Sequence, residues 1–397
     1  MNRAIRCGIA LGWAMGAALC LGQASPPPQS QRKIALALEQ QGKNVEAEAA
    51  WRVYLKDHPS SPEPYAHLGL LEARQEHYKE AVPLYRKALA MNPEIPGLRL
   101  NLGLALYKGG ELKQAIQEFQ PLLKSQPPSS TEAQRLTILS GMAHYGLSEY
   151  DEAVPFLKSA AARDTANLPL RLALAHSCLW SKQYQCVLDV YHEILTLDAE
   201  SAESDMLAGE ALSEMKDTPG AIQQFRAAIK ANPTEPNVHF GLGYLLWMQT
   251  EYRAAASEFQ AELVNDPDHI QAMLYLADSL IQQNQYETAA PLLEKVLKQD
   301  SGQGLGHLDL GIVLAQAGRN EEALRELTVA AKLIPEDVNV HWRLGRLYRS
   351  MGKIDEAKAE FAKASSLNKA ADEALFNKIK NGNAPRTPAQ QPAPPEK

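Results

Sequence analysis

Residues 304–335 read GLGHLDLGIVLAQAGRNEEALRELTVAAKLIP, two short amphipathic segments separated by a break at residues 317–320. Small and apolar residues recur at helical spacing in both segments: Leu310, Gly311 and Leu314 in the first, and Ala323, Leu327 and Ala330 in the second. Two antiparallel helices pack closely only where small side chains let the backbones approach, and Gly311 and Ala323 are placed to allow this. The stretch therefore predicts a packed helical hairpin that ends at Pro335.

The same pattern recurs along the chain in ten in-phase copies. The eighth position of each copy is small: Ala35, Gly69, Gly103, Gly141, Ala175, Gly209, Gly243, Ala277, Gly311 and Gly345. The twentieth is also small or β-branched: Ala47, Ala81, Ala115, Ala153, Val187, Ala221, Ala255, Ala289, Ala323 and Ala357. The twenty-fourth is large and apolar: Trp51, Tyr85, Phe119, Leu157, Tyr191, Phe225, Phe259, Leu293, Leu327 and Phe361. Each step is 34 residues except the step from Gly103 to Gly141, which has four extra residues in the turn-rich stretch 127–131.

This regularity resembles the tetratricopeptide repeat family, whose unit is a 34-residue helix–turn–helix with these small, large and proline positions. Prolines end many of the units: Pro59, Pro93, Pro127, Pro233, Pro267 and Pro335. Other residues take this slot in the remaining units, among them Thr165, Ala199, Ser301 and Lys369. The resemblance implies an all-α fold, a right-handed α-solenoid of stacked helix–turn–helix hairpins, with ten repeats over residues 28–371.

Residues 1–24 have the features of a secretory signal peptide. Arg3 and Arg6 precede an uncharged, mostly apolar run at residues 7–21, and small residues follow at a cleavage site before Ser25. The run is shorter than the roughly 20 residues that span a bilayer as a helix. We therefore expect an exported protein, periplasmic or secreted, with no integral membrane span after cleavage. An uncleaved membrane anchor and a lipid on Cys20 are the alternatives.

The two ends of the repeat array have different predicted roles. Residues 25–27 form a short proline-rich spacer ahead of the first repeat. Residues 372–383 carry apolar residues at helical spacing and suit a C-terminal capping helix, because a terminal repeat leaves one face uncovered. Residues 384–397, rich in proline, glutamine and alanine, are predicted to be a disordered tail, with binding to a proline-reading groove as the alternative.

Composition and motifs argue against catalysis and against nucleic-acid binding. The net charge of −7 becomes more negative once Arg3 and Arg6 are removed, so the basic field that phosphates require is missing. The repeats leave no space for a catalytic domain, and no phosphate-binding loop, zinc helix or nucleophile elbow is present in the sequence. We expect no enzyme activity, no cofactor and no metal. Three histidines share the fourth position of their repeats, His239, His307 and His341, and are interpreted as interior packing residues rather than metal ligands.

The signal segment apart, the chain has two cysteines, both in the fifth repeat. Cys178 falls late in the first helix and Cys186 just after the turn, so they lie near each other in the hairpin. Export permits a disulfide. However, Cys186 occupies an outward-leaning position, which counts against the geometry of a bond. From the sequence, both a disulfide and free thiols remain open.

The resemblance also implies where binding takes place. In this family the first helix of each unit lines a concave groove, chiefly through its second, fifth, ninth, twelfth and thirteenth positions. The candidate partner-binding residues at those positions are Leu104, Tyr107, Met142, Tyr145, Leu179, Trp180, Phe240, Tyr244, Trp247, Trp342, Arg346 and Arg349. The residues that form a carboxylate clamp in some family members are not matched, apart from Asn101.

The middle of the groove is apolar and aromatic, which is typical of a binding surface. The alternative is that a tightly wound array buries part of this stripe against itself. The arginines of the tenth repeat either receive an acidic segment or are ordinary solvated residues.

The sequence thus predicts a non-catalytic, exported scaffold or adaptor that binds protein or peptide segments in its concave groove. The alternative function is an envelope carrier of a glycan or lipid ligand in the aromatic groove. The partner, the biological process and any self-association are not determined by the sequence.

Overall fold

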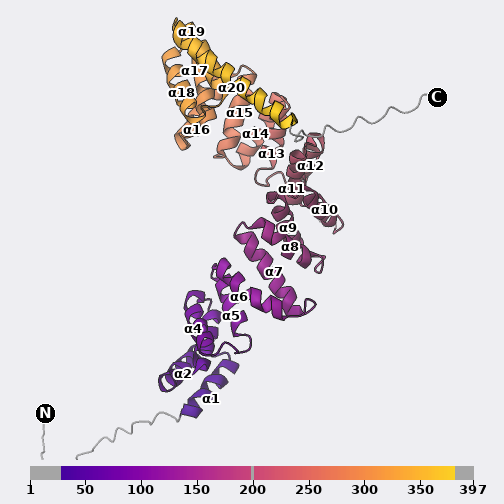
Figure 1. Ribbon diagram of the computed structural model, residues 1–397, viewed down its shortest axis with the longest axis vertical. Coiled ribbons are helices and arrows are strands. Elements are labelled where there is room, and N and C mark those ends of the chain that lie inside the picture. Colours follow the sequence, from indigo (N-terminus) through magenta and orange to yellow (C-terminus); the bar gives the residue numbers. More distant parts are fainter. Residues whose placement is uncertain (1–27, 198–200, 381–397) are drawn as a thin grey trace, which may run out of the picture. The chain divides into compact units, whose positions relative to one another are not determined.

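The computed structural model describes residues 28–197 and 201–380, and within these ranges the regular structure is entirely helical (Figure 1). The predicted signal peptide at 1–24, the spacer at 25–27 and the tail at 384–397 lie outside the described residues. The chain divides into two compact units, one that reaches to Glu149 and one that begins at Tyr150.

Each predicted repeat consists of two helices. In the first unit these are α1 (Pro28–Gln40), α2 (Asn44–Asp57), α3 (Pro62–Arg74), α4 (Tyr78–Met91), α5 (Leu98–Lys108), α6 (Leu112–Ser125) and α7 (Thr131–Gly146). In the second they are α8 (Tyr150–Ala161), α9 (Leu168–Trp180), α10 (Tyr184–Leu195), α11 (Ala202–Glu214), α12 (Thr218–Ala231), α13 (Val238–Met248), α14 (Tyr252–Asn265), α15 (Ile270–Gln282), α16 (Tyr286–Gln299), α17 (Gly304–Gln316), α18 (Asn320–Leu333), α19 (Val338–Ser350) and α20 (Ile354–Lys380). The predicted all-α solenoid of helical hairpins is confirmed.

The turn inside each hairpin has the same backbone conformation in all ten repeats. Its fifteenth residue has positive φ in every copy: Gly42, Glu76, Gly110, Ser148, Lys182, Lys216, Thr250, Asn284, Gly318 and Gly352. Directly after Gly318, the backbone N–H of Arg319 donates to the carbonyl oxygen of Leu314 at 2.9 Å. This bond satisfies a carbonyl group at the end of α17. Glycine adopts this left-handed conformation without steric cost, whereas the repeats that have another residue at this position carry backbone strain there.

Helix starts are set by side-chain caps at several repeats. The Asp337 carboxylate accepts hydrogen bonds from the backbone N–H groups of Asn339 and Val340 at 2.8 and 3.2 Å. The Asn167 side chain accepts from the N–H of Leu170 at 3.1 Å. These bonds satisfy N–H groups that have no partner within the helix, so polar residues before the apolar segments fix where α19 and α9 begin.

The close contact between the two helices of a hairpin is made by the eighth and twenty-fourth positions. A Cβ atom built on Gly311 would lie 2.6 Å from Cγ of Leu327, and one on Gly103 would lie 2.6 Å from Cε1 of Phe119. Only glycine permits these distances, because real Cβ atoms do not approach so closely. Gly311 also approaches the backbone at Ala323, as the sequence predicts, because a Cβ atom on it would lie 3.4 Å from the carbonyl oxygen of Ala323.

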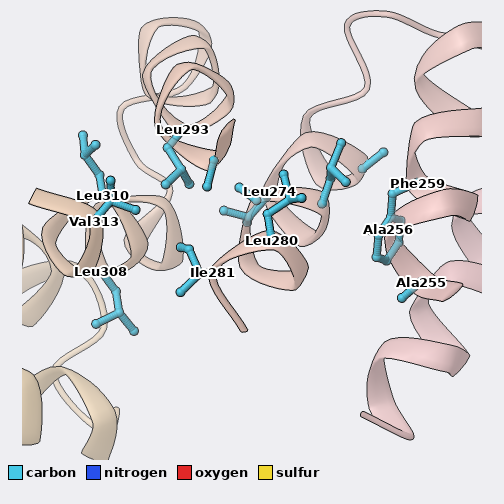
Figure 2. Close-up of a cluster of buried hydrophobic side chains, with 14 of the residues drawn as sticks. Ala255, Ala256, Phe259, Leu274, Leu280, Ile281, Leu293, Leu308, Leu310 and Val313 are labelled. Carbon is cyan, nitrogen blue, oxygen red and sulfur yellow. The ribbon is translucent and has the colours of Figure 1, made fainter. Parts of the chain in front are cut away.

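Neighbouring hairpins share a continuous core. Figure 2 shows part of the largest cluster, in which Ala255 and Phe259 of α14, Leu274 of α15 and Leu293 of α16 are buried, together with Leu308 of α17. Each hairpin therefore covers an apolar face that it cannot bury alone, as expected of a repeat array.

The end of the array differs in form from the predicted capping segment. Helix α20 runs without a break from Ile354 to Lys380, so the described residues of the predicted capping helix at 372–383 continue the second helix of the tenth hairpin. Residues 381–383 lie outside the described residues.

Replacement of Ala255 by leucine tests the packing at the twentieth position. Ala255 is 0% exposed, so a larger side chain there is expected to overpack the contact and to lower the free energy of unfolding by about 1–3 kcal/mol. Denaturant unfolding of the variant measures this loss, with Ser257→Leu at an exposed position of the same helix as the control. Unchanged stability of Ala255→Leu would contradict the assigned register.

Replacement of Thr250 by glycine tests the strain in the turns. A β-branched residue at φ 61° is strained, so the glycine variant is expected to be more stable by about 0.5–1 kcal/mol despite its greater freedom when unfolded. The denaturation midpoint measures this gain. Asn284→Gly, at the equivalent turn, should gain less because asparagine tolerates this conformation better, and a loss of stability at Thr250 would show that the turn is not strained.

Candidate functional site

A cavity of about 570 Å³ lies among α9–α13 of the second unit. Its walls combine aromatic and aliphatic side chains with two carboxylates and one amine: Leu179, Trp180, Lys182, Tyr184, Glu210, Ser213, Glu214, Phe225, Asn237, Phe240, Gly241, Tyr244 and Leu245. Four of the predicted groove residues, Leu179, Trp180, Phe240 and Tyr244, are thus brought together around one cavity, while the other eight are not.

The Phe225 ring forms part of the wall because two glycines leave room for it. A Cβ atom on Gly209 would lie 2.9 Å from the ring, and a Cβ on Gly241 would collide with it. Gly209 occupies the eighth position of its own repeat, whereas Gly241 belongs to the next repeat. The ring is therefore held between two hairpins, and its place in the wall depends on both glycines.

Glu262 of α14 holds the start of α13, which carries Phe240 and Tyr244. Its carboxylate is 1% exposed and accepts hydrogen bonds from the backbone N–H groups of Asn237 and Phe240, both at 3.0 Å. A carboxylate at a helix N-terminus is stabilised by the free N–H groups and by the helix dipole. This buried contact fixes the position of α13 relative to α14.

Trp247 does not line the cavity, although the sequence placed it in the groove. Its indole N–H donates to the Asp278 carboxylate on α15 at 2.5 Å, and its ring lies 5.0 Å from the Tyr275 ring, centroid to centroid. The Tyr244 ring lies 5.3 Å from the same Tyr275 ring at a steep angle. Trp247 and Tyr275 thus form a half-buried aromatic cluster that supports Tyr244 from behind.

One wall of the cavity carries a largely exposed aromatic ring. The Trp180 side chain is 63% exposed, and its ring stacks on that of Tyr150 with centroids 6.2 Å apart. A large exposed indole beside an apolar cavity is the kind of group that anchors a bound partner, since its burial removes much apolar surface from water.

The acidic side chains of the cavity come from α11. Glu210 and Glu214 are one helical turn apart, and Glu214 accepts a hydrogen bond from the Tyr184 hydroxyl at 3.5 Å. Desolvation by the cavity walls raises the pKa of Glu210 above its ordinary value, and nearby His176 opposes that rise. Within residues 28–197 and 201–380 neither glutamate makes a salt bridge, since His176, which acts on Glu210 from a distance, pairs with Glu203 at 2.8 Å.

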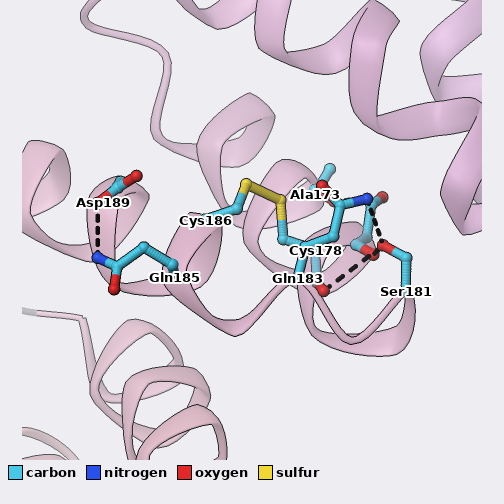
Figure 3. The surroundings of a disulfide bond; sticks show 8 residues. Ala173, Cys178, Ser181, Gln183, Gln185, Cys186 and Asp189 are labelled. Carbon is cyan, nitrogen blue, oxygen red and sulfur yellow. Dashed lines mark hydrogen bonds between the residues drawn. A yellow bond between two sulfur atoms is a disulfide. The ribbon is translucent and has the colours of Figure 1, made fainter.

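A disulfide closes the hairpin that carries one wall of the cavity. Cys178 and Cys186 are bonded, with their Cα atoms 5.8 Å apart (Figure 3). Cys178 is buried and Cys186 half-buried, as predicted, but this arrangement does not prevent the bond, because the turn brings the two helices close enough. The loop closed by the disulfide contains three residues that line the cavity, Leu179, Trp180 and Tyr184. The bond therefore limits the backbone movement of these residues.

The predicted groove residues of the first unit lie on α5 and α7. Leu104 and Tyr107 are half-buried and pack against the core of that unit, and burial raises the pKa of the Tyr107 hydroxyl. Met142 and Tyr145 are half-buried on α7. These four residues belong to a different compact unit from the cavity residues.

The predicted residues of the tenth repeat form a cationic face on α19. The side chain of Trp342 is 42% exposed, and the guanidinium carbons of Arg343 and Arg346 lie 5.3 and 4.7 Å from the centre of its ring. Arg349 lies 5.8 Å from the Phe361 ring. The arginines therefore lie against aromatic rings in a cation–π arrangement, and the contact of Arg349 with Phe361 joins α19 to α20.

The histidine row proves to be a set of hydrogen-bonded histidine–glutamate pairs within hairpins. Nδ1 of His239, His307 and His341 lies 2.7, 2.6 and 2.6 Å from a carboxylate oxygen of Glu258, Glu326 and Glu360, respectively. Arg99 and Glu118 make the same contact in the third repeat at 2.7 Å. The histidines thus connect the two helices of one repeat rather than stacking with each other. No cluster of potential metal ligands occurs in the described ranges.

Sequence reasoning missed several residues of the cavity. Glu210 and Glu214 occupy the ninth and thirteenth positions of the sixth repeat, so the same positional rule that selected Tyr244 could have found them. Tyr184 begins a second helix, and no positional signal marks it. Gly241 lines the cavity because of a contact with another repeat, which the periodicity of one repeat does not show.

The fold and the site define a helical-hairpin repeat protein with an aromatic cavity among α9–α13. Models of the tetratricopeptide repeat match residues 32–94, 72–137, 206–270, 280–341 and 314–375, more than half of the chain. The chain therefore belongs to the tetratricopeptide repeat family. In the part of the chain that the structure describes, no helix has the length and apolarity needed to cross a membrane.

Several known proteins are similar to this chain. Anaphase-promoting complex subunit 3 of Schizosaccharomyces pombe is 20% identical over 320 residues, which cover 80% of this chain and 47% of that protein. Human protein O-mannosyl-transferase TMTC1 is 25% identical over 210 residues, 51% of this chain and 22% of that protein. The chain thus spans less than half the length of either protein.

A solved structure titled as YrrB, a TPR protein with an unusual peptide-binding site, is 18% identical. It aligns with a TM-score of 0.39 over 48% of this chain and 97% of its own.

Thiol labelling tests the disulfide. In the native protein, alkylation mapped to peptides that contain Cys178 and Cys186 is expected only after treatment with a reductant, because both sulfurs are bonded. The mass of the labelled peptides measures this. Labelling of both cysteines in unreduced, denatured protein would show that the bond is absent.

Proposed function

We propose that the chain is a non-catalytic scaffold or adaptor that binds a segment of a partner protein in the cavity among α9–α13. The observation that carries the proposal is the exposed Trp180 at an aromatic cavity of about 570 Å³. Membership of the tetratricopeptide repeat family supports it, since proteins of this family act as protein-interaction scaffolds.

The size and chemistry of the cavity suit a few large side chains of a bound segment. Its volume falls within the range of about 300–1,000 Å³ typical of ligand sites. Phe225, Phe240 and Leu245 supply apolar walls, while Ser213 and Asn237 supply polar groups that can fix the orientation of a backbone. Binding energy from such a site comes mainly from apolar burial around aromatic anchors.

The wall is also held in place before binding. Glu262 fixes the start of α13, and the Cys178–Cys186 bond closes the loop that contains Trp180, the last residue of α9. A site whose groups are already in position loses less conformational entropy on binding than a flexible one. This favours recognition of a defined segment.

We also propose that the protein is exported and works in the periplasm or outside the cell. Residues 1–24 carry the pattern of a secretory signal, and the bond between Cys178 and Cys186 fits an oxidising compartment. Both observations agree with the same location, although they come from separate parts of the chain.

The aromatic walls favour one second candidate, a carrier of a glycan or lipid. Trp180, Tyr184 and Tyr244 offer ring faces of the kind on which a sugar or an acyl chain packs. The two functions differ in what the cavity captures: a protein under the first and a non-protein ligand under the second.

Photo-crosslinking from the cavity tests the proposed function. The change is p-benzoylphenylalanine in place of Trp180, which is exposed and lines the cavity. In an envelope extract we expect a discrete protein adduct, identified by mass spectrometry with the linked peptide. The control carries the same residue at Val264, 80% exposed on α14 and outside the cavity lining, and should not give this adduct. A lipid or glycan adduct would support the carrier instead, and no specific adduct would contradict both.

A further inference from the structure

We propose that the cavity among α9–α13 recognises a positively charged side chain, preferably arginine, flanked by apolar residues in the partner segment. This rests on the proposed function, because it names the chemistry of the segment that the scaffold binds. It depends on the placement of Glu210 and Glu214 among aromatic rings.

The two carboxylates face the same cavity from one helix. Glu210 and Glu214 are four residues apart on α11, where like charges repel each other mildly. No described residue forms an ion pair with either of them, and the Tyr184 hydroxyl at 3.5 Å is a weak, neutral partner for Glu214. His176 acts on Glu210 from a distance, but its ring already pairs with Glu203 at 2.8 Å. A cation that enters between the two glutamates would relieve their repulsion and would add opposite charge.

The rings around the carboxylates also attract cations. Trp180, Tyr184, Phe240 and Tyr244 line the cavity together with the two glutamates. The face of an aromatic ring carries a negative partial charge, so a cation that packs against it gains attraction from the ring as well as from the carboxylates. Arginine fits this setting better than lysine, because its planar guanidinium stacks on rings and pairs with carboxylates in a fork geometry.

The alternative occupants meet a physical cost. An acidic segment would bring like charge to Glu210 and Glu214. A wholly apolar segment would cover the two carboxylates and remove water from them without supplying a counter-charge, which is unfavourable. Lys182 also lines the cavity, so its charge offsets one carboxylate at most and leaves the other to be neutralised. A cation with apolar neighbours satisfies both the rings and the remaining charge.

Selection from a random library of 12-residue peptides, displayed on phage, tests the proposal with the full mature chain. We expect the selected peptides to carry arginine or lysine next to tryptophan, phenylalanine or leucine. Their binding should be lost in Trp180→Ala, which removes an exposed ring and should leave the fold intact. Replacement of the basic residue in a selected peptide by glutamine should weaken binding by about tenfold.

A variant that removes both carboxylate charges then tests whether Glu210 and Glu214 bind the cation. In Glu210→Gln/Glu214→Gln, affinity for the basic peptides should fall by about tenfold or more, and their advantage over the glutamine versions should disappear. The matched control, Glu287→Gln/Glu321→Gln, removes two charges at exposed positions of α16 and α18 and should leave the preference unchanged.

The outcomes separate the two proposals. Selected peptides that need Trp180 but are acidic or neutral would overturn the recognition of a cation and leave the proposed scaffold function in place. Persistence of the preference for arginine in the Glu210→Gln/Glu214→Gln variant would also overturn it. If no peptide binds in a manner that depends on Trp180, the cation proposal fails, and the crosslinking experiment decides whether the proposed function fails with it.

Discussion

The structure depends on the close approach of two helix backbones at one point in each hairpin. Where Gly103 or Gly311 faces Phe119 or Leu327, a single added carbon would meet the partner side chain at 2.6 Å. This contact sets the distance between the helices, and the left-handed turn residue sets their direction. The apolar faces that remain are then covered by the next hairpin, so local packing and stacking are two consequences of the same spacing.

The candidate site arises where contacts beyond the regular pattern are added to this framework. Gly241 admits the Phe225 ring from the preceding repeat, Glu262 holds the start of α13, and a disulfide closes the α9–α10 turn. Each of these features restrains a different wall of the cavity. Together they restrain the walls that carry Trp180, Phe225, Phe240 and Tyr244, while Glu210 and Glu214 face the same cavity from α11.

Several residues of the candidate site could be predicted from the sequence, but not which of the groove residues line the cavity and which pack against other helices. Trp180, Phe240 and Tyr244 were found by position alone, because the first helix of each repeat presents the same face. Trp247 shares that face, yet its indole N–H donates to Asp278 of the next repeat, and Trp247 is not among the residues that line the cavity. The histidine row was interpreted as interior packing, and the structure shows that each ring meets a carboxylate of the facing helix, from Glu258, Glu326 or Glu360. The period of one helix does not show that partner.

The sequence alone determined the all-α class, the ten helical hairpins and the small and large positions within them. The reason is that each 34-residue unit places small and large residues at the same positions, so each unit packs as the same hairpin. The tertiary structure alone decided which groove residues meet in a cavity, which ones pack against a neighbouring repeat, and that Cys178 and Cys186 are bonded. These outcomes depend on distances between side chains of different helices, and periodicity fixes the position of a residue on its own helix but not the atoms that it meets.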